Sequence, residues 1–327
     1  MSIKATIKKI PGVKQVNNIL KGGDFQRDES FFYKHYAKGE NTKEQLDSLL
    51  LMELHKLEKG FSATNMRPFG EKKIGEITRI AEKLEKNGWS DCFSYTLALS
   101  ALKEFIVLFE KNGWCDFPQY KKAKSFMADR QPKATLDYGA QKICIDECAA
   151  ISADEFERFI DSRHSTREYS DKPVTDNELR RAVSIAQKAP SACNRQMCKV
   201  YIAKKAGSKK ALSDVLPGLN LFEMDNTNLA VITFDMAFAS FAGERNQGWL
   251  NAGLFAMNFA NALHAERIGS CFLQWGETNK KEKEIKKKLG IPESERIAVC
   301  IAYGHYKKES HVLKSARRPI DDALKYI

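Results

Sequence analysis

The stretch that most constrains the fold lies at residues 248–269, GWLNAGLFAMNFANALHAERIG, because it is apolar or small on almost every helical face. In a soluble protein, a helix of this kind is buried on most of its surface. Four small residues within it would let another helix approach closely: Ala252, Gly253, Ala256 and Ala260. The stretch therefore predicts a helix over about residues 244–268, either at the centre of a domain or in a subunit interface.

Short apolar segments alternate with helical patterns around this stretch. The segments are rich in residues that favour strands. They are CKVYIA (198–203), LAVITFD (229–235), CFLQW (271–275) and RIAVCIAYG (296–304). A very basic helix is expected over about residues 279–289, between the last two segments. Strands that alternate with helices in this way predict an α+β domain over residues 151–327, with a sheet flanked by helices.

The first 150 residues contain helical patterns only. TKEQLDSLLLMELHKLEKG (42–60) predicts an amphipathic helix with Thr42 at its N-cap, and GEITRIAEKLEKNGW (75–89) predicts another. The turn EKNGWSD (85–91) recurs as EKNGWCD (110–116), which indicates a second helix–turn unit. Residues 1–40 are expected to form a loose lead-in with one short helix at most. The sequence thus predicts an all-helical domain over residues 1–150, whose role it does not indicate.

Charge and cysteine content narrow the class of protein. The net charge of +11 is spread along the chain, with +5 in residues 1–150 (25 − 20) and +6 in residues 151–327 (28 − 22). A diffuse excess of positive charge can steer anionic substrates or cofactors. The sequence contains no basic stripe interleaved with aromatic residues, which is the pattern that predicts nucleic-acid binding. The apolar stretches are too short to predict a membrane span, and the first residues lack a signal core. Eight cysteines without metal-ligand spacing predict a cytoplasmic protein with reduced thiols and no metal site.

Two capping boxes frame a cationic octapeptide. Ser152 with Glu155, and Thr175 with Glu178, each have the spacing that begins a helix. Between them lies SRHSTREY (162–169), which holds two arginines, a histidine, three serine or threonine hydroxyl groups and a terminal tyrosine. Arginine presents a fixed fork of donors that matches phosphate oxygens. The octapeptide is therefore a candidate phosphate site, and from composition alone a solvated helix end is the alternative.

A second stretch supplies amide side chains. In AQKAPSACNRQMCKVYIA (186–203), Pro190 and Ser191 interrupt a helix, and Asn194 and Gln196 follow in the loop before a strand. Side-chain amides present a donor and an acceptor side by side. That pattern suits the uracil-like edge of a flavin ring. We therefore expect the octapeptide and this loop to converge on one cofactor.

Together, RHSTREYSDKPVTDNELRRAVSIAQKAPSACNRQ resembles the N-terminal signature of the nitroreductase family of FMN enzymes. In that family an Arg-x-Ser-x-Arg/Lys run is followed by Ala-Pro-Ser-x-x-Asn-x-Gln. The resemblance continues through the apolar helix to the basic tail and covers about residues 152–327. It implies a nitroreductase-like mixed sheet flanked by helices, and an intertwined homodimer with FMN at the subunit interface.

The resemblance also implies a role for each matching residue. Arg163 and Ser165 would bind the FMN phosphate, with His164 beside them. Arg167 would approach the pyrimidine edge of the flavin. The remaining candidates are Ser191, Asn194 and Gln196 in the loop, Trp275 and Gly276 near the ring face, and Lys314 and Arg317 as the rest of the phosphate clamp. The sequence departs from the family in having Met197-Cys198 after Gln196, and in Trp275, a bulky residue that would narrow the substrate pocket.

The expected activity is centred on the flavin, so no catalytic side chain is predicted. NAD(P)H would deliver hydride and leave, and a small electrophilic acceptor would follow in the same site, which gives ping-pong kinetics. The acceptor could be a nitro compound, a quinone or a specialised biosynthetic intermediate. Two alternatives stay open: a relative that oxidises a substrate or fragments the flavin, and a non-catalytic scaffold whose helical domain binds a partner.

Overall fold

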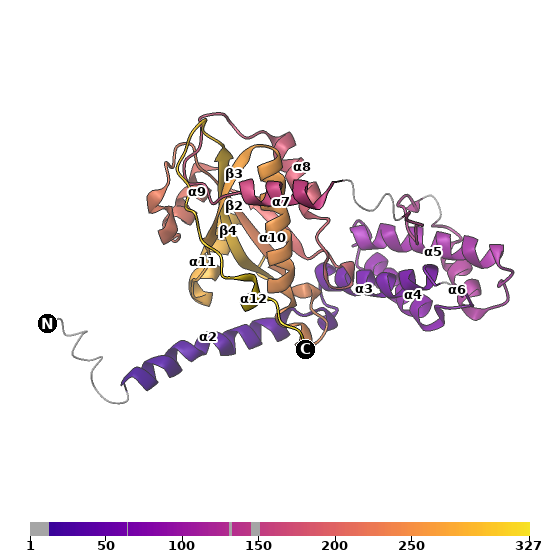
Figure 1. The fold of residues 1–327 in the computed structure, drawn as a ribbon. Coiled ribbons are helices and arrows are strands. Elements are labelled where there is room, and N and C mark those ends of the chain that lie inside the picture. Colours follow the sequence, from indigo (N-terminus) through magenta and orange to yellow (C-terminus); the bar gives the residue numbers. More distant parts are fainter. Residues whose placement is uncertain (1–12, 64, 131–132, 145–150) are drawn as a thin grey trace.

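The fold was analysed in a computed structural model that describes residues 13–63, 65–130, 133–144 and 151–327. Its first part consists of helices: α2 (Val13–His35), η1 (Ala37–Gly39), α3 (Lys43–Phe61), α4 (Glu71–Lys86), α5 (Phe93–Lys111) and α6 (Pro118–Met127). Helices α3 to α6 form one body beside the sheet, which we call the helical module (Figure 1). Every helix of the described residues is too short or too polar to cross a membrane.

The helical module has its own hydrophobic core. Leucines of α3 pack against α4 and α5, and α6 closes the cluster. The predicted N-cap of α3 is confirmed, because Thr42 Oγ1 accepts a hydrogen bond from the backbone N–H of Gln45 (3.2 Å). The two Asn-Gly turns are alike as well. Gly88 and Gly113 have φ of 70° and 71°, a left-handed conformation that glycine adopts easily, and Trp89 and Trp114 then pack back onto the core.

The second part of the chain forms a four-stranded sheet with helices around it. Its strands are β1 (Cys198–Ile202), β2 (Asn228–Asp235), β3 (Ile268–Gln274) and β4 (Glu295–His305). Its helices are α7 (Ala153–Ser162), α8 (Asp176–Ala186), η4 (Ala192–Asn194), α9 (Ala206–Ser213), η5 (Pro217–Leu221), η6 (Met236–Phe238), η7 (Ala242–Glu244), α10 (Gln247–Ala265), α11 (Asn279–Leu289) and α12 (Ile320–Ala323). Both predicted capping boxes are confirmed, at the starts of α7 and α8.

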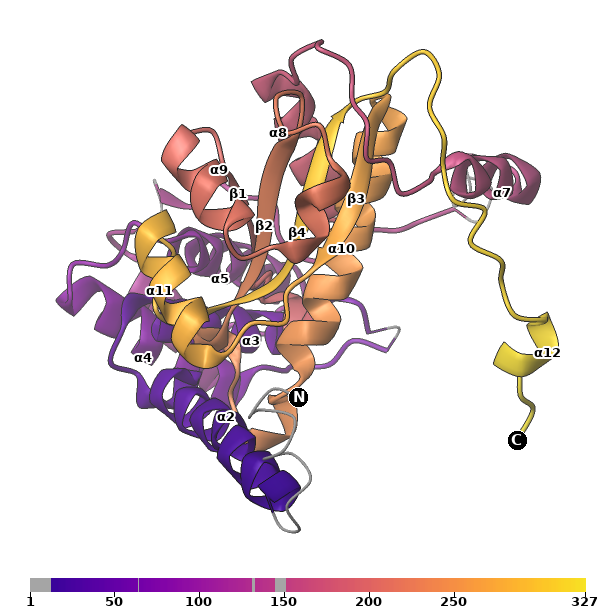
Figure 2. The same ribbon diagram turned by 90° about the vertical axis from the view of Figure 1, so that its left-hand side faces the viewer.

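The strands lie in the order β1-β2-β4-β3, so β1 and β3 are the two edges of the sheet (Figure 2). All three strand pairs are antiparallel, and the parallel pairing seen among the described residues is an isolated bridge between Ser165 and Ser270. The predicted α+β class is confirmed, with this predominantly antiparallel sheet in place of a strongly mixed one. Each strand was predicted to within three residues at either end.

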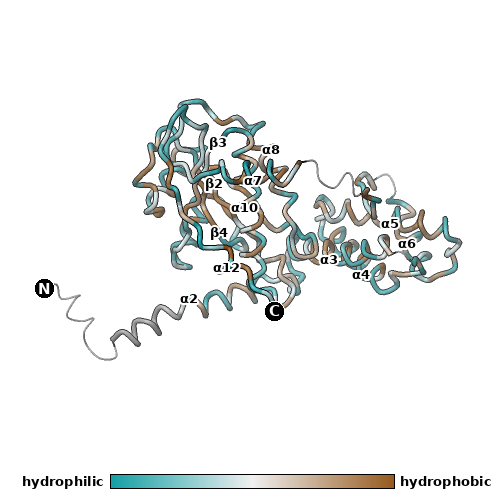
Figure 3. The backbone as a smooth tube through the Cα atoms, viewed as in Figure 1, coloured by the Kyte–Doolittle hydropathy of each residue, from teal (hydrophilic) through white to brown (hydrophobic). Residues whose placement is uncertain are grey.

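Helices cover both faces of the sheet because successive strand residues point to opposite sides. Ala230 and Ile232 of β2 pack towards α8 and α10, whereas Leu229 and Val231 pack towards α9, η5 and α11. Apolar residues of β2, β4 and α10 lie together at the centre of the sheet domain (Figure 3). No further strand pairs with the outer edge of β3 in the described residues, and an isolated bridge from Ser165 to Ser270 forms there.

Helix α10 confirms the prediction of a helix at the centre of a domain, and its place in a subunit interface stays a prediction. One side is buried against the sheet and α8, with Ala252, Ala256 and Phe259 among the buried residues. The other side carries an exposed apolar stripe, which consists of Trp249, Leu250, Leu254 and Met257. Nothing lies within 4 Å of a Cβ built on Gly253, in the middle of that stripe.

Helix α2 differs from the prediction for residues 1–40, since it has 23 residues rather than a few. It packs against the sheet domain, where Arg296 of β4 forms an ion pair with Asp28 (2.7 Å). Phe32 of α2 belongs to the same hydrophobic cluster as α8 and α10. The helix therefore gains its stability from the sheet domain, which the polar local sequence does not reveal.

Candidate cofactor site

The octapeptide, called the cationic segment below, is an extended chain along the outer edge of β3. The backbone N–H of Thr166 donates to Ser270 O (3.1 Å), and the buried Tyr169 hydroxyl donates to Ala302 O (3.1 Å). Two glycines make this close approach possible. A Cβ on Gly304 would lie 2.6 Å from Tyr169 Cβ, and a Cβ on Gly269 would lie 3.1 Å from Thr166. The segment is thus held against the sheet by backbone contacts.

The extended backbone places Arg163, Ser165 and Arg167 on one side, since alternate residues of a strand share a face. All three are partly buried, while His164 is exposed. They converge on the Cys271 thiol: burial raises the pKa of Cys271, and Arg167, Ser165 and Arg163 each act to lower it.

The two arginines lack partners of opposite charge. Within the described part of the chain, no carboxylate forms an ion pair with Arg163 or Arg167. Arg163 Nε is buried without a hydrogen-bond partner, and so is Ser270 Oγ close by. Buried donors are normally satisfied. A phosphate would accept from these donors and neutralise the cations.

A histidine that the sequence did not single out lies beside Arg163. His264 of α10 has Nε2 2.7 Å from Ser162 Oγ, and Nδ1 2.8 Å from the hydroxyl of Tyr306. Burial lowers the pKa of His264, and the positive charge of Arg163 lowers it further. At neutral pH the imidazole is therefore uncharged and orients the start of the cationic segment.

A cavity of about 510 Å³ opens next to Arg167, between β3 and η5. Leu216, Pro217 and Leu221 form an apolar wall, while Gln274 and Glu277 add polar groups. Ligand sites of this size typically combine a mostly apolar surface with a few polar groups. The cavity is therefore large enough, and of the right character, for a flat heteroaromatic ring.

The two candidates after β3 have different surroundings. Gly276 lines the cavity. The side chain of Trp275 does not, because it packs on the core beneath α11 and its Nε1 donates to Glu282 Oε2 (3.2 Å). The indole is thus fixed by the protein and does not narrow this cavity.

The second predicted stretch, residues 190–197, is called the amide loop. Asn194 and Gln196 are exposed, and the backbone N–H of Gln196 donates to Ser191 Oγ (3.0 Å). Cys193, Asn194 and Gln196 have φ of 52°, 50° and 50°. Residues other than glycine rarely adopt positive φ, and such backbone often marks a functional loop.

Within one chain the structure does not bring the amide loop and the cationic segment together. Ser270, beside the cationic segment, lies on the edge strand β3 and pairs with Tyr303 of β4. Tyr303 in turn pairs with Asn228, the first residue of β2. The amide loop leads into Cys198 on the other edge strand, which aligns with Phe234 at the opposite end of β2. From strand spacing and rise, the two corners are about 25 Å apart. The predicted convergence on one cofactor is therefore wrong for a single chain.

The basic tail does not reach the cationic segment either. Lys314 and Arg317 are exposed, and the hydrogen bonds and ion pairs of residues 308–327 stay within the tail. The tail ends in exposed apolar residues, including Ile320 and Tyr326. Nothing within one chain thus completes a phosphate clamp from this region.

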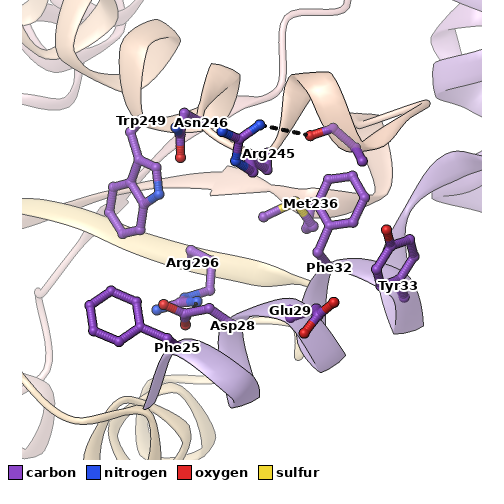
Figure 4. A pocket seen from close by; sticks show the side chains of 11 residues that line it. Phe25, Asp28, Glu29, Phe32, Tyr33, Met236, Arg245, Asn246, Trp249 and Arg296 are labelled. Atoms are coloured by element: carbon purple, nitrogen blue, oxygen red, sulfur yellow. Dashed lines mark hydrogen bonds and ion pairs between the residues drawn. The ribbon is translucent and has the colours of Figure 1, made fainter. Parts of the chain in front are cut away.

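A second cavity, of about 420 Å³, lies between α2 and the start of α10 (Figure 4). Its floor is Arg296, which is neutralised by Asp28 and by Glu282 (2.9 Å) and lies over the ring of Trp249 (5.6 Å to the ring centre). Arg296 is therefore neutralised within the protein, whereas Arg245, which also lines this cavity, is exposed and forms no ion pair with the described residues.

Sequence reasoning missed three residues that shape these regions: Arg195, His264 and Cys271. Arg195 is buried inside the amide loop and pairs with Glu244, 49 residues away. No local pattern indicates such a pair. The only available signal was an arginine between two amide residues in a short loop.

Comparison with known proteins gives a family for part of the chain. Residues 160–305 match the family model described as the Nitroreductase family. The matched range begins just before the cationic segment and ends with β4, so it includes the amide loop and leaves out the helical module. No curated protein matches the chain.

Several solved structures are similar to the sheet domain. A Bacillus subtilis protein assigned as a nitroreductase has a TM-score of 0.48 and 19% identity, over 54% of this chain and all of its own. A nitroreductase family protein from Streptococcus pneumoniae has a TM-score of 0.45 and 21% identity, over 53% of this chain and all of its own. A Desulfovibrio desulfuricans protein assigned as a nitroreductase, solved in complex with FMN, has a TM-score of 0.44 and 22% identity, over 52% of this chain and 95% of its own.

Proposed function

Since residues 160–305 form a nitroreductase-family domain, we propose that the protein is a homodimeric, cytoplasmic FMN-dependent oxidoreductase. It takes hydride from NAD(P)H and reduces a small electrophilic acceptor such as a nitro compound or a quinone. The observation that carries the proposal is the pair Arg163 and Arg167, which form no ion pair with a carboxylate of the described residues. Arg167 lines a cavity of about 510 Å³, and Arg163 acts with it on Cys271, which lines the same cavity. Two uncompensated cations at or near a cavity favour an anionic ligand.

The residues present fit FMN. Arg163 and Ser165 would hold the phosphate, where the buried Nε of Arg163 has no hydrogen-bond partner among the described residues. Arg167 would face the ring from the cavity wall, and its charge would stabilise negative charge on the pyrimidine edge. The apolar wall of η5 would exclude water from the ring. When bound, FMN supplies the hydride chemistry, and the protein supplies binding, orientation and electrostatics.

The proposal includes a dimer because one chain holds only part of the site. A two-fold axis can bring the cationic segment of one protomer to the amide loop of its partner. Ser191, Asn194 and Gln196 would then reach the flavin from the second subunit. The exposed apolar stripe of α10 supports this part of the proposal, since exposed apolar patches commonly mark interfaces.

The direct test is an absorption spectrum of the purified protein, followed by anaerobic titration with NADH and NADPH. We expect a flavin spectrum that bleaches within one equivalent of at least one of the two. Bound flavin that neither cofactor reduces would favour a relative that oxidises a substrate or fragments the flavin. Protein that neither contains FMN nor takes it up would exclude the oxidoreductase and favour the scaffold.

A further inference from the structure

We infer that Arg195 and helix α3 of the helical module act together to hold the amide loop in the conformation that the cofactor site requires. The inference rests on the proposed function, because it concerns one wall of that same site. It assigns a role to the helical module, which lies outside the family match. Arg195 is a positioning residue here, since its side chain points away from solvent and into the protein.

The amide loop needs support from outside itself. Three of its non-glycine residues, Cys193, Asn194 and Gln196, have positive φ. Such backbone persists only where the surrounding structure determines it. Within the loop, the contacts are the turn bonds to Ser191 O and Ala192 O, and the bond from Gln196 N–H to Ser191 Oγ.

Arg195 supplies that support. Arg195 is 1% exposed. Its guanidinium donates hydrogen bonds to both carboxylate oxygens of Glu244 and to Phe238 O, and its Nε donates to Ala192 O (2.8 Å). Glu244 is in turn held by the backbone N–H of Ser240 (2.7 Å) and by its hydroxyl (2.9 Å). A buried polar network in which every member is satisfied is rigid. The side chain therefore fixes the loop to the segment before α10.

Helix α3 reaches the same acceptor from the other side. The hydroxyl of Ser48, which is buried, donates to Phe238 O (3.2 Å), the carbonyl that Arg195 also contacts. Next to it, the backbone N–H of Ala37 donates to Ala239 O (2.6 Å). Helix α3 also packs directly on η4, the first turn of the amide loop. The helical module and the loop thus share one hydrogen-bonded junction.

This junction explains how a module without cofactor residues can control cofactor binding. If α3 shifts, Phe238 O moves, and Arg195 loses one of its fixed acceptors. The loop would then relax from its positive-φ conformation, and Asn194 would lose its place at the surface. The effect is local to residues 190–197, whereas loss of a purely structural contact would destabilise the whole protein.

The experiment compares full-length Arg195→Met, Arg195→Lys and Ser48→Ala with the unchanged protein. Two quantities are measured: amide hydrogen exchange over residues 190–197 in FMN-free protein, and the dissociation constant of FMN. In Arg195→Met we expect exchange in the loop to rise by about tenfold or more, with FMN binding weakened to a similar extent. Lysine should rescue part of both effects, because it keeps the charge but not the fork. Ser48→Ala should shift both in the same direction by less.

Arg130→Met is the matched control. Arg130 also donates to both oxygens of a glutamate, Glu85 (2.7 and 2.9 Å), and to a carbonyl, Phe126 O, but within the helical module. We expect it to leave exchange in the loop unchanged. If Arg195→Met fails to fold, the double variant Arg195→Met/Glu244→Gln removes both charges and takes its place.

The outcomes separate the inference from the proposed function. Loop exchange that rises in the Arg195 variants of a protein that never binds FMN supports the positioning role and contradicts the cofactor. Normal FMN binding with unchanged loop exchange in Arg195→Met or in the double variant overturns the positioning role. A uniform rise of exchange over the whole sheet domain also overturns it, because Arg195 would then serve general stability.

Discussion

The buried and partly buried arginines of the sheet domain fall into two groups that differ in their partners. Arg195 and Arg296 are buried, and each forms an ion pair with a carboxylate. Arg163 and Arg167 are partly buried and have none within the described residues. A buried charge without a partner is costly. The second group is therefore retained at a cost in stability that a bound anion would offset.

Replacing Arg163 with alanine should weaken FMN binding by about 2–4 kcal/mol, or about 30- to 1,000-fold, the scale for removing one partner of a buried charge pair. The reason is the loss of the guanidinium whose Nε has no hydrogen-bond partner in the described part of the chain. The measurement is a fluorescence titration of FMN-free protein. Arg181→Ala is the control, since Arg181 is exposed and pairs with Glu266 (3.0 Å) on the protein surface. Equal FMN affinity in the Arg163 variant would remove the phosphate assignment.

The titration of His264 should report on the same place. Burial and Arg163 lower its pKa from 6.5. Bound phosphate should raise this pKa, and so should Arg163→Ala, which NMR titration of the imidazole can measure. Because the folded pKa lies below the unfolded one, protons bind the unfolded state first as the pH falls below about 6.5, and the free energy of unfolding decreases. Urea unfolding at several pH values should show a smaller decrease in His264→Gln. If neither phosphate nor Arg163→Ala changes the pKa of His264, Arg163 does not lie beside this imidazole.

At the scale of elements, the sequence predicted what local chemistry determines. The N-cap of α3 and both capping boxes were found because a few neighbouring side chains define them. The central strands β2 and β4 were found because they are largely buried on both faces and rich in apolar residues. Periodicity and capping thus sufficed for most elements of the sheet domain.

The elements that were missed depend on distant contacts. Helix α2 is long because Phe32 packs with α10 and Asp28 pairs with Arg296, and neither contact leaves a local pattern. The extended form of the cationic segment depends on Gly269 and Gly304, about 100 residues or more further along the chain. The residue types of the site could be predicted because arginines and amides are recognised from the local sequence. Its geometry could not, because the local sequence does not determine which corner of the sheet each group occupies.

The exposed stripe of α10 leads to a prediction about association. Leu250 and Leu254 are 57% and 41% exposed, on the side of the helix that faces away from the sheet. If they lie in the dimer interface, Leu250→Asp should weaken association by about 2 kcal/mol or more, because it buries a carboxylate without a partner. Sedimentation over a range of concentrations measures this. Val107→Asp, at an exposed position of α5 in the helical module, should change nothing. If the Leu250→Asp protein associates as strongly as the unchanged protein, the dimer interface lies on another surface.

At the scale of the whole molecule, the two parts of the candidate site lie at opposite corners of one sheet. The cationic segment borders β3, and the amide loop enters β1 at the other end of the strands. Neither is close enough to complete the other within one chain, so under the proposed function the smallest unit with a complete site is the dimer. The helical module supports the amide loop through Phe238 O, and in the dimer it would therefore influence the partner's flavin rather than its own.

Mixing two defective proteins tests this arrangement. Arg163→Ala removes the phosphate donor, and Asn194→Gly removes the amide side chain while glycine keeps the positive φ. In a mixed dimer with shared sites, one site carries both changes and the other carries neither. An equal mixture should therefore recover about a quarter of the FMN-binding sites after the subunits exchange. Arg163→Ala mixed with Arg167→Ala is the control, because both changes affect the cationic segment and every site keeps one defect. If the first mixture recovers no more FMN-binding sites than the control, each site belongs to a single chain. The amide loop would then lie outside the FMN site, because it is too far from the cationic segment of its own chain.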